Sequence, residues 1–353
     1  MRHSLALVFS RLLLMAFAHS GSLEPKITAD GVPAGFIQPA MPPGNRTDFD
    51  AIYADVSKSA TLSSRSAKGV RIAARQARTK PKYFERTFGP INAASNAGGY
   101  IGFVTFPSYD VNACAASCNA HGFNTTGGPC VFFNIWTAVI NGASGNTVCS
   151  LYNSVAANST STYTGQGDLI VTASRGYKRK SLIKDGSFQD YTCVVTKTNG
   201  CPYAPSRYWT RFVPAGYDFV LINNGPAHTG NSSTFFYFSP PSPDAYAYGA
   251  TLEYALPTNA VEGKTYVISF FYTNSNYSPA PTNLTGPLVS ALWNGVSVIG
   301  APQVGPETFD GLSYMNIFGE VVAQGGDTFA LQNGIAFAHA MYVDDISIFE
   351  KWY

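Results

Sequence analysis

Six cysteines are the residues of this chain best suited to covalent or metal chemistry: Cys114, Cys118, Cys130, Cys149, Cys193 and Cys201. Cys114 and Cys118 stand one turn apart on one face of an expected helix that begins after Asp110. We expect Cys118 to pair with Cys130. Cys114 would then pair with Cys149, because such nested loops keep both bridges between one helix and two adjacent strands. Two other pairings of these four are possible.

Each of these bridges would restrict the unfolded chain by roughly 3 kcal/mol. Cys193 and Cys201 enclose a short loop, and a local disulfide there would fix the first connection of the second domain. Zinc is the weaker alternative for the first four cysteines, because they do not form Cys-x-x-Cys pairs. An oxidising compartment would let all six pair.

The sequence lacks the motifs of the common hydrolases and nucleotide-binding enzymes. No His-Glu-x-x-His, Gly-x-Ser-x-Gly or phosphate-binding glycine loop occurs among 353 residues. A glycosidase needs two carboxylates about 5 to 10 Å apart across the sugar. Glu253 and Glu320 lie in expected strands, but no Glu-x-Asp-x-x-Glu strand supports them. We interpret both as solvated or salt-bridged residues and predict no catalytic activity.

Aromatic side chains are the residues that could bind a sugar, because their faces cover the C–H patches of the ring. The candidates are Tyr208, Trp209, Tyr246, Tyr248, Trp293 and Tyr314. A core role is the alternative for each of them, and we favour it for Trp209. Tyr246 and Tyr248 lie in a loop over 239–249 that is rich in Pro, Ser and Asp, so we expect these two to be exposed and to contribute most.

Composition argues against two classes of protein. Charged residues make up 12% of the chain and the net charge is +2, whereas a nucleic-acid binder needs clustered Lys and Arg on a folded face. A mean hydropathy near zero, with no long apolar run after the N-terminus, argues against a multi-pass membrane protein. We therefore expect no nucleic-acid partner and no transmembrane segment after removal of the leader.

The first 18 residues have the features of a signal peptide. A basic start is followed by the apolar stretch from Leu12 to Ala18, which ends in the small-x-small motif of a cleavage site. Arg11 interrupts the apolar stretch. A short buried helix is the alternative, which we do not favour because no partner element follows it. Six Asn-x-Ser/Thr acceptors also fit export: Asn45, Asn124, Asn158, Asn231, Asn276 and Asn283. We expect a secreted glycoprotein, with the cell wall as one destination.

Residues 19–82 are expected to be disordered, because they are rich in Pro, Ala, Ser and Gly and then turn basic. The basic part, from Lys58 to Lys82, contains no acidic residue. We interpret it as a solvated propeptide or spacer, with a basic helix on an anionic polymer or membrane as the alternative. Lys178-Arg179-Lys180 forms a second basic run, which we interpret as an exposed linker, with proteolytic processing as the alternative.

The hydrophobic pattern predicts a mainly β chain with two domains after this segment. A small α+β domain would cover 83–178, and an antiparallel β-sandwich would cover 182–353. In the second domain, short runs of β-branched and aromatic residues recur between turn signals, a spacing typical of a sandwich or barrel. The near-continuous apolar run Thr265–Tyr272 would be a central strand.

The first domain resembles the PAN/Apple fold, in the variant found in secreted fungal proteins. The resemblance rests on the helical Cys-x-x-x-Cys motif, the strand motif Cys-x-Phe-Phe-Asn at 130–134 and the final Cys-Ser-Leu-Tyr at 149–152, and it covers roughly 83–178. It implies binding of protein or carbohydrate without catalysis.

The second domain resembles a CenC-like carbohydrate-binding module, a jelly-roll of the galactose-binding type. Its opening, Leu182–Gln189, and its last strand, Tyr342–Ile348, are similar to the borders of that family, and Gly263–Phe270 is similar to an interior strand. The resemblance spans about 182–353 and implies glycan binding.

Many modules of this kind hold a structural Ca²⁺ between the first and last strands. The resemblance therefore implies calcium as a cofactor, with Asp345 as the best ligand and Asp344 and Asp185 behind it. Gln189 stands where the family usually has Glu, and an amide offers an oxygen without charge. The alternative is that one carboxylate of the Asp344-Asp345 pair is bonded to backbone amides, and the sequence leaves both interpretations open.

Taken together, these patterns predict a secreted, non-catalytic protein that binds cell-wall or host glycans through the jelly-roll. A structural or adhesive surface protein that binds protein partners, through the PAN/Apple-like domain, is the first alternative. A weak glycosidase is the second.

Overall fold

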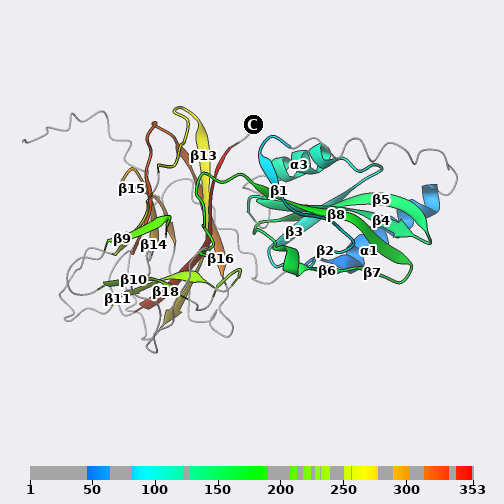
Figure 1. Ribbon diagram of the computed structural model, residues 1–353, viewed down its shortest axis with the longest axis horizontal. Helices are drawn as coiled ribbons and strands as arrows, with labels where there is room; N and C mark the ends of the chain where they lie inside the picture. The colour runs from blue at the N-terminus through cyan, green and yellow to red at the C-terminus, as the bar shows by residue number, and fades with distance from the viewer. Residues whose placement is uncertain are drawn as a thin grey trace, which may run out of the picture.

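The computed structural model describes residues 46–63, 81–121, 128–189, 207–212, 218–223, 227–230, 232–238, 250–255, 257–276, 289–301, 314–333 and 339–351. Strands dominate these residues and form an N-terminal domain and a C-terminal sandwich (Figure 1). The prediction of a mainly β chain that ends in an antiparallel β-sandwich is confirmed. None of the helices in these stretches has the length and apolar character of a membrane span.

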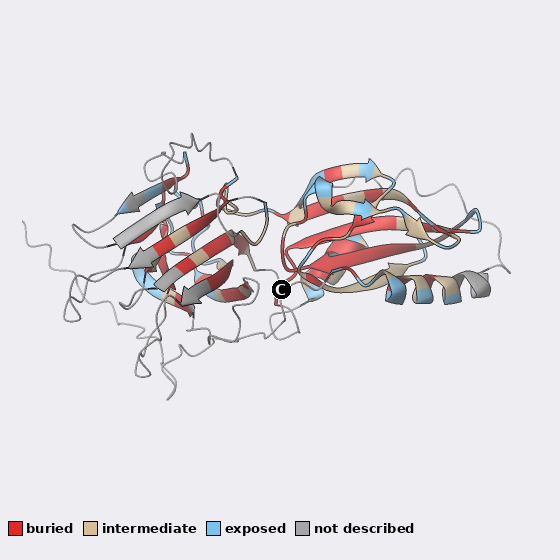
Figure 2. Ribbon diagram, turned by 90° about the horizontal axis from the view of Figure 1, so that it is seen from below, coloured by how far each residue is buried: buried red, intermediate tan, exposed pale blue. Residues whose placement is uncertain are grey.

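The first domain is built on an antiparallel sheet with the strand order β1-β8-β4-β5-β3, in which β7 also pairs with β8. Its strands are β1 (Phe84–Ile91), β3 (Tyr100–Phe106), β4 (Phe132–Ile140), β5 (Ala143–Tyr152), β7 (Gly165–Gln166) and β8 (Leu169–Arg179). A small ladder joins β2 (Ala94–Ser95) to β6 (Ser161–Tyr163), after the 3₁₀ turn η1 (Asn158–Thr160). The central strand β4 is buried along nearly its whole length (Figure 2).

Two helices cover the two faces of this sheet (Figure 1). Helix α3 (Val111–Ala120) covers the face that presents Phe133 and Ile135. Helix α1 (Phe49–Ser63) covers the face that presents Trp136 and Val148. Because side chains alternate between the faces of a strand, one sheet supplies both apolar surfaces.

Helix α1 corrects one sequence prediction, since it lies inside the segment 19–82 that we expected to be disordered. Asp48 caps the helix by accepting the Ala51 amide hydrogen at 3.0 Å. Ile52 and Val56, one turn apart, are fully buried against the sheet. These two apolar side chains are enough to dock the helix, although the segment as a whole is polar.

The two disulfides expected in this domain are confirmed. Cys114 bonds to Cys149 on β5, and Cys118 bonds to Cys130 at the start of the β4 segment. All four sulfur-bearing residues are buried beside Phe84 and Tyr177 in the core under α3. The bridges therefore hold α3 to the sheet at two successive turns. Cys193 and Cys201 lie outside the described residues.

The second domain is a sandwich of two antiparallel sheets. The β13 sheet has the order β10-β11-β18-β13-β16, and the β14 sheet has the order β15-β14-β17-β12-β9. The first is formed by β10 (Asp218–Asn223), β11 (Ser233–Phe238), β13 (Thr265–Asn276), β16 (Met315–Val322) and β18 (His339–Glu350). The second is formed by β9 (Trp209–Phe212), β12 (Thr251–Tyr254), β14 (Val289–Trp293), β15 (Val296–Ala301) and β17 (Phe329–Asn333).

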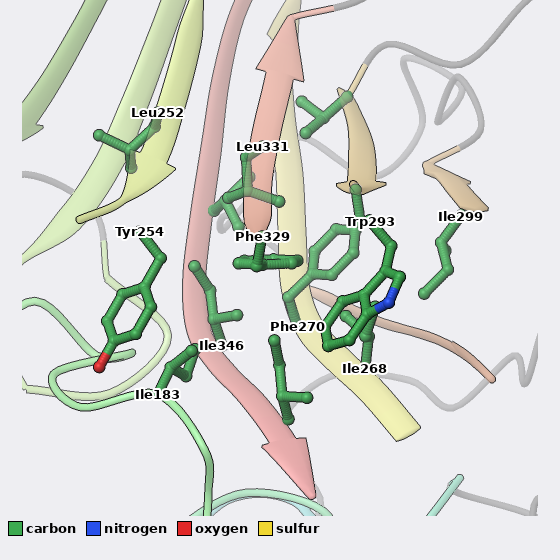
Figure 3. Close-up of a cluster of buried hydrophobic side chains, with 14 of the residues drawn as sticks. Ile183, Leu252, Tyr254, Ile268, Phe270, Trp293, Ile299, Phe329, Leu331 and Ile346 are labelled. Carbon is green, nitrogen blue, oxygen red and sulfur yellow. The ribbon is translucent and has the colours of Figure 1, made fainter. Parts of the chain in front are cut away.

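The sandwich core lies between the two sheets. Ile268 and Phe270 from β13 meet Trp293 from β14 and Phe329 from β17, and all four are buried (Figure 3). The opening and closing segments of the domain also meet, because the Leu182 amide donates to the Ile348 carbonyl at 2.6 Å and the Ile346 amide donates to Gly186. The opening segment therefore pairs with the second half of β18, beyond the residues that β11 reaches.

The two domains contact each other through the outer face of the β13 sheet. Val267 and Phe349 of the sandwich share a buried cluster with Val131 and Phe132 of the first domain. Arg179, at the end of β8, is only 4% exposed, and its guanidinium lies over the ring of Phe349. The connection between the domains is therefore short and packed.

Arg179 corrects the interpretation of the second basic run as an exposed linker. Its side chain donates to the carbonyls of Cys130 and Cys118 and to the amide oxygen of Asn119. Lys178 lies on the opposite side of β8 and is exposed beside Glu85. Cleavage at this run would require β8 to leave the sheet, because a protease needs an accessible, extended segment.

Candidate functional site

Four of the six aromatic side chains proposed for sugar binding are buried: Tyr208, Trp209, Trp293 and Tyr314. Trp209 packs between Phe188 and Tyr254, with ring centroids 5.3 Å apart in both cases. The Trp293 ring lies inside the sandwich (Figure 3), and its indole N–H donates to Asp327 at 2.9 Å. Tyr208, Trp209 and Trp293 belong to the sandwich core, and Tyr314 is buried beside the His228 ring. None of the four offers an open face to a sugar, so the structure corrects their assignment as a platform.

Several other predicted site residues lie outside the described residues. Tyr246 and Tyr248 belong to the connection between β11 and β12, and four of the glycosylation acceptors also fall in such segments: Asn45, Asn124, Asn231 and Asn283. Of the other two acceptors, Asn158 is exposed in the turn η1, and Asn276 is the last residue of β13.

Two of the predicted calcium ligands, Asp344 and Asp345, lie where β18 bulges, whereas Asp185 lies in the opening segment, where its carbonyl accepts the Trp209 indole N–H at 3.1 Å. Asp344 is fully buried and accepts backbone hydrogens from His228 at 2.8 Å and Thr229 at 3.0 Å. Asp345 accepts the Thr229 hydroxyl at 2.6 Å and lies 2.7 Å from the His228 ring nitrogen. Burial, with the Asp345 carboxylate beside it, raises the pKa of Asp344 to about 9. The alternative of a carboxylate bonded to backbone amides therefore describes Asp344.

Gln189 decides how well this place fits a cation. Its amide nitrogen donates to the carbonyls of Ser187 at 2.6 Å, Ser232 at 3.3 Å and Thr229 at 3.4 Å. A Ca²⁺ ion needs six to eight oxygen ligands, but here N–H groups point at the oxygens of Asp344 and at these carbonyls. In the part of the chain that the structure describes, no cluster of three or more acidic, His or Cys side chains is arranged to hold a metal. The residues present do not fit calcium.

The two carboxylates considered for glycoside hydrolysis do not form a pair. Glu253 lies between the core residues Leu252 and Tyr254, so it points away from the core on the outer face of the β14 sheet. Glu320 lies on the outer face of the other sheet, where Lys351 binds it at 2.7 Å. Since the sandwich core separates them, one sugar cannot lie between them.

The outer face of the β14 sheet carries a different set of side chains suited to sugar. Phe212, on the edge strand β9, is 62% exposed and is the only exposed aromatic ring among the side chains that the structure describes. Thr210, two residues earlier on the same face, is also exposed and pairs in register with Glu253. An open aromatic ring thus lies beside a hydroxyl and a carboxylate.

The pairing across the sheet extends this polar surface. Phe212 lies opposite Thr251 on β12, and Thr251 lies opposite Gln332 on β17. Neighbouring strands are about 4.8 Å apart, so Gln332 lies roughly 10 Å from Phe212 along this row. We call Thr210, Phe212, Glu253 and Gln332 the Phe212 face. It combines a ring for C–H contacts with three polar groups for hydroxyls.

Sequence reasoning missed Phe212, although a signal for it was present. Once Trp209 is assigned to the core, the period of two in a strand places Thr210 and Phe212 on the opposite face. The segment Trp-Thr-Arg-Phe is too short for this alternation to be clear without the register to β12.

No protein-family model and no curated protein matches the chain. Solved structures similar to it include the CBM22-1 xylan-binding domain of Paenibacillus barcinonensis Xyn10C, at 15% identity, 43% of this chain, 91% of that chain and a TM-score of 0.29. The CBM22-1–CBM22-2 tandem domain of the same protein matches at 12% identity, 63% of this chain and 73% of that chain, also with a TM-score of 0.29.

A third match is a structure of carbohydrate-binding modules from the β-sandwich superfamily, at 14% identity, 77% of this chain, 100% of that chain and a TM-score of 0.24. These three structures are of carbohydrate-binding domains. At these scores the likeness assigns no ligand to this chain. The PAN/Apple-like and fungal resemblances remain predictions.

Proposed function

We propose that this chain is a secreted, non-catalytic glycan-binding protein and that its sandwich binds sugar at the Phe212 face. The observation that carries the proposal is the exposure of the Phe212 ring, at 62%, on a sheet face with polar neighbours. Burying an aromatic ring is favourable, so a sugar that covers the open Phe212 ring and reaches Glu253 and Gln332 would gain from that contact. The predicted loop tyrosines, Tyr246 and Tyr248, would add further rings.

Binding of this kind uses shallow contacts. A sugar ring stacked on Phe212 would bury its C–H face, while Thr210, Glu253 and Gln332 would exchange hydrogen bonds with the hydroxyls. Because those hydroxyls leave water to bind, the net affinity of a single site is modest. Cell-wall or host polysaccharides, which repeat the same unit, are the ligands that such a face suits best.

The test is a glycan array and an insoluble-polysaccharide pull-down with the full chain made in a secretory host. We expect Phe212→Ala to weaken binding about tenfold, which corresponds to about 1.4 kcal/mol. Val322→Ala is the matched control, because Val322 is 59% exposed on the other sheet. Tyr246→Ala and Tyr248→Ala test the contribution of the loop.

Equal loss in Phe212→Ala and Val322→Ala would reject the Phe212 face. Absence of any glycan binding by the folded chain would instead favour the adhesive alternative, in which the protein partners of the first domain carry the function. Release of reducing sugar from a bound polysaccharide would contradict the non-catalytic assignment.

A further inference from the structure

The face of the first sheet that lies under α1 is an apolar surface into which one side of a helix fits. Ile52 and Val56 are 0% and 1% exposed, and they insert among Trp136, Val148 and Val171. Phe49, one turn before Ile52, stacks on Tyr163 with ring centroids 3.5 Å apart and planes 9° from parallel. Three side chains at i, i+3 and i+7 therefore make the apolar contact, as on any amphipathic helix.

Polar contacts at the rim of this surface fix the register of the helix. The Tyr53 hydroxyl donates to Asp168 at 2.8 Å, and the Thr105 hydroxyl donates to Asp55 at 3.0 Å. Before the helix, the Thr47 hydroxyl donates to the Ser95 carbonyl at 2.9 Å. The surface thus selects one sequence in one orientation, rather than any apolar segment.

The fit beneath the helix is nevertheless incomplete. The Trp136 indole nitrogen and the Tyr163 hydroxyl are buried and have no hydrogen-bond partner among the described residues. A buried donor without an acceptor costs roughly 1 to 3 kcal/mol. Water would bind both groups if α1 left, so part of the apolar gain from docking is lost and undocking is easier than burial alone indicates.

No disulfide holds α1 to the sheet, because all the cysteines that the structure describes are in the bridges Cys114–Cys149 and Cys118–Cys130. Residues 64–80 connect α1 to the domain and lie outside the described residues. A connection of this length can span about 50 Å when extended. The same helix can therefore reach the sheet of a neighbouring copy, where it would make the contacts that it now makes within its own chain.

We propose that the sheet face under α1 is a helix-docking surface, and that α1 of a second copy of this chain can occupy it in place of the resident helix. The second copy is the partner whose chemistry matches in every position, because it brings the same Phe49, Ile52 and Val56. Exchange of an identical element creates a closed dimer at low cost, since all contacts made within one chain are made again between two.

The first experiment uses two full-length variants. Ile52→Asp with Val56→Asp places two carboxylates against the apolar face and undocks the helix, whereas Ala51→Asp with Ala54→Asp adds the same charges on its exposed side. A fluorescent synthetic peptide of residues 46–63 is titrated into each. We expect saturable binding to the undocked variant, competed by unlabelled peptide, and binding at least about tenfold weaker to the control.

The second measurement is the oligomeric state of the unmodified chain at rising concentration, by light scattering. We expect a dimer in the unmodified chain and in the Ala51/Ala54 control, and none in the Ile52/Val56 variant. Failure of the folded Ile52/Val56 variant to bind the peptide would overturn the docking surface. A chain that stays monomeric at every concentration would overturn the second copy as its occupant.

Hydrogen exchange of the unmodified chain keeps the proposal testable if the Ile52/Val56 variant does not fold. Amides of Ile52 and Val56 should exchange at least about a hundredfold faster than those of Ile135 and Trp136 on β4, since α1 would open while the sheet stays folded. Equal rates would show that helix and sheet open only together, and would overturn the proposal.

Discussion

The two helices of the first domain cover opposite faces of one sheet, but they are held there by different means. Helix α3 is bonded to the rest of the domain by two disulfides. The Arg179 guanidinium also donates to the Cys118 carbonyl near the end of α3. Helix α1 is held by Ile52, Val56 and a few hydrogen bonds at its rim. While the disulfides are intact, α3 cannot separate from the sheet. No such bond prevents α1 from separating while the sheet stays folded.

How deeply a helix is buried and how firmly it is held are therefore separate properties. Ile52 is as fully buried as Cys114, at 0% exposure for both. Local openings cover a wide range of free energies within one domain, and covalent closure moves a segment to the global end of that range. Helix α1, which lies outside the bridged part of the chain, is therefore the element that can separate from the sheet and be replaced by α1 of a second copy.

Removal of the disulfides should have the largest effect on stability. The bridge Cys114–Cys149 closes 35 residues and Cys118–Cys130 closes 12. We expect Cys114→Ser with Cys149→Ser to lower the free energy of unfolding by roughly 4 kcal/mol, and the other pair by roughly 3. Urea unfolding followed by circular dichroism measures both. A smaller loss from the longer loop would contradict the entropic explanation.

The next effect is expected at Arg179, which holds the end of α3 beside the contact with the sandwich. Arg179→Ala removes three hydrogen bonds, to the carbonyls of Cys130 and Cys118 and to the amide oxygen of Asn119, at a cost of about 3 kcal/mol. Lys178→Ala is the matched control, since Lys178 is 42% exposed beside Glu85 and should change stability by no more than about 0.5 kcal/mol. Thermal unfolding compares the stability of the two variants. Equal losses of stability would disprove that Arg179 holds the end of α3.

Sequence patterns predicted well where one local rule decided the outcome. The spacing of Cys114 and Cys118 placed both sulfurs on one helix face, and nesting then gave the observed pairs. The hydrophobic run from Thr265 was found as a central strand. The meeting of Gly186 with Ile346 followed from a family resemblance rather than from the residues.

Predictions failed where tertiary pairing decided. The face on which Phe212 lies depends on the register of β9 against β12, and the burial of Arg179 between two lysines depends on which side of β8 meets α3. Helix α1 was missed because only Ile52 and Val56 are fully buried in a polar segment. The i, i+4 spacing was visible in the sequence, but the sheet face that it fits was not.

The two helix caps offer a smaller and more direct test of the comparison. Asp110 accepts the amides of Asn112 and Ala113, and Asp48 accepts that of Ala51. Replacement of a capping Asp by Ala costs about 1 kcal/mol. We expect Asp110→Ala to lower the midpoint of global unfolding. Asp48→Ala should leave that midpoint unchanged and instead speed hydrogen exchange within α1. A shift of the global midpoint by Asp48→Ala would show that α1 is coupled to the whole domain.

The smallest expected effect is alkaline and concerns Tyr163 under α1. Burial, with Asp50 and Tyr53 nearby, raises the pKa of Tyr163 to about 12 in the docked state, whereas a solvated tyrosine titrates near 10. The docked state holds the phenolic proton more tightly, so docking is unaffected below pH 10 and weakens as the pH rises from 10 through 12. Tyr163→Phe should remove the part of this dependence that Tyr163 contributes and leave that of Tyr53, whose pKa is raised by its hydrogen bond to Asp168. It should not weaken docking at pH 7, because the Tyr163 hydroxyl has no partner there among the described residues. The measurement is the hydrogen-exchange rate of α1 amides relative to β4 amides, at matched pH, in the unmodified chain and in Tyr163→Phe. If Tyr163→Phe loosens α1 at neutral pH, the hydroxyl is bonded and the incomplete fit beneath the helix is wrong.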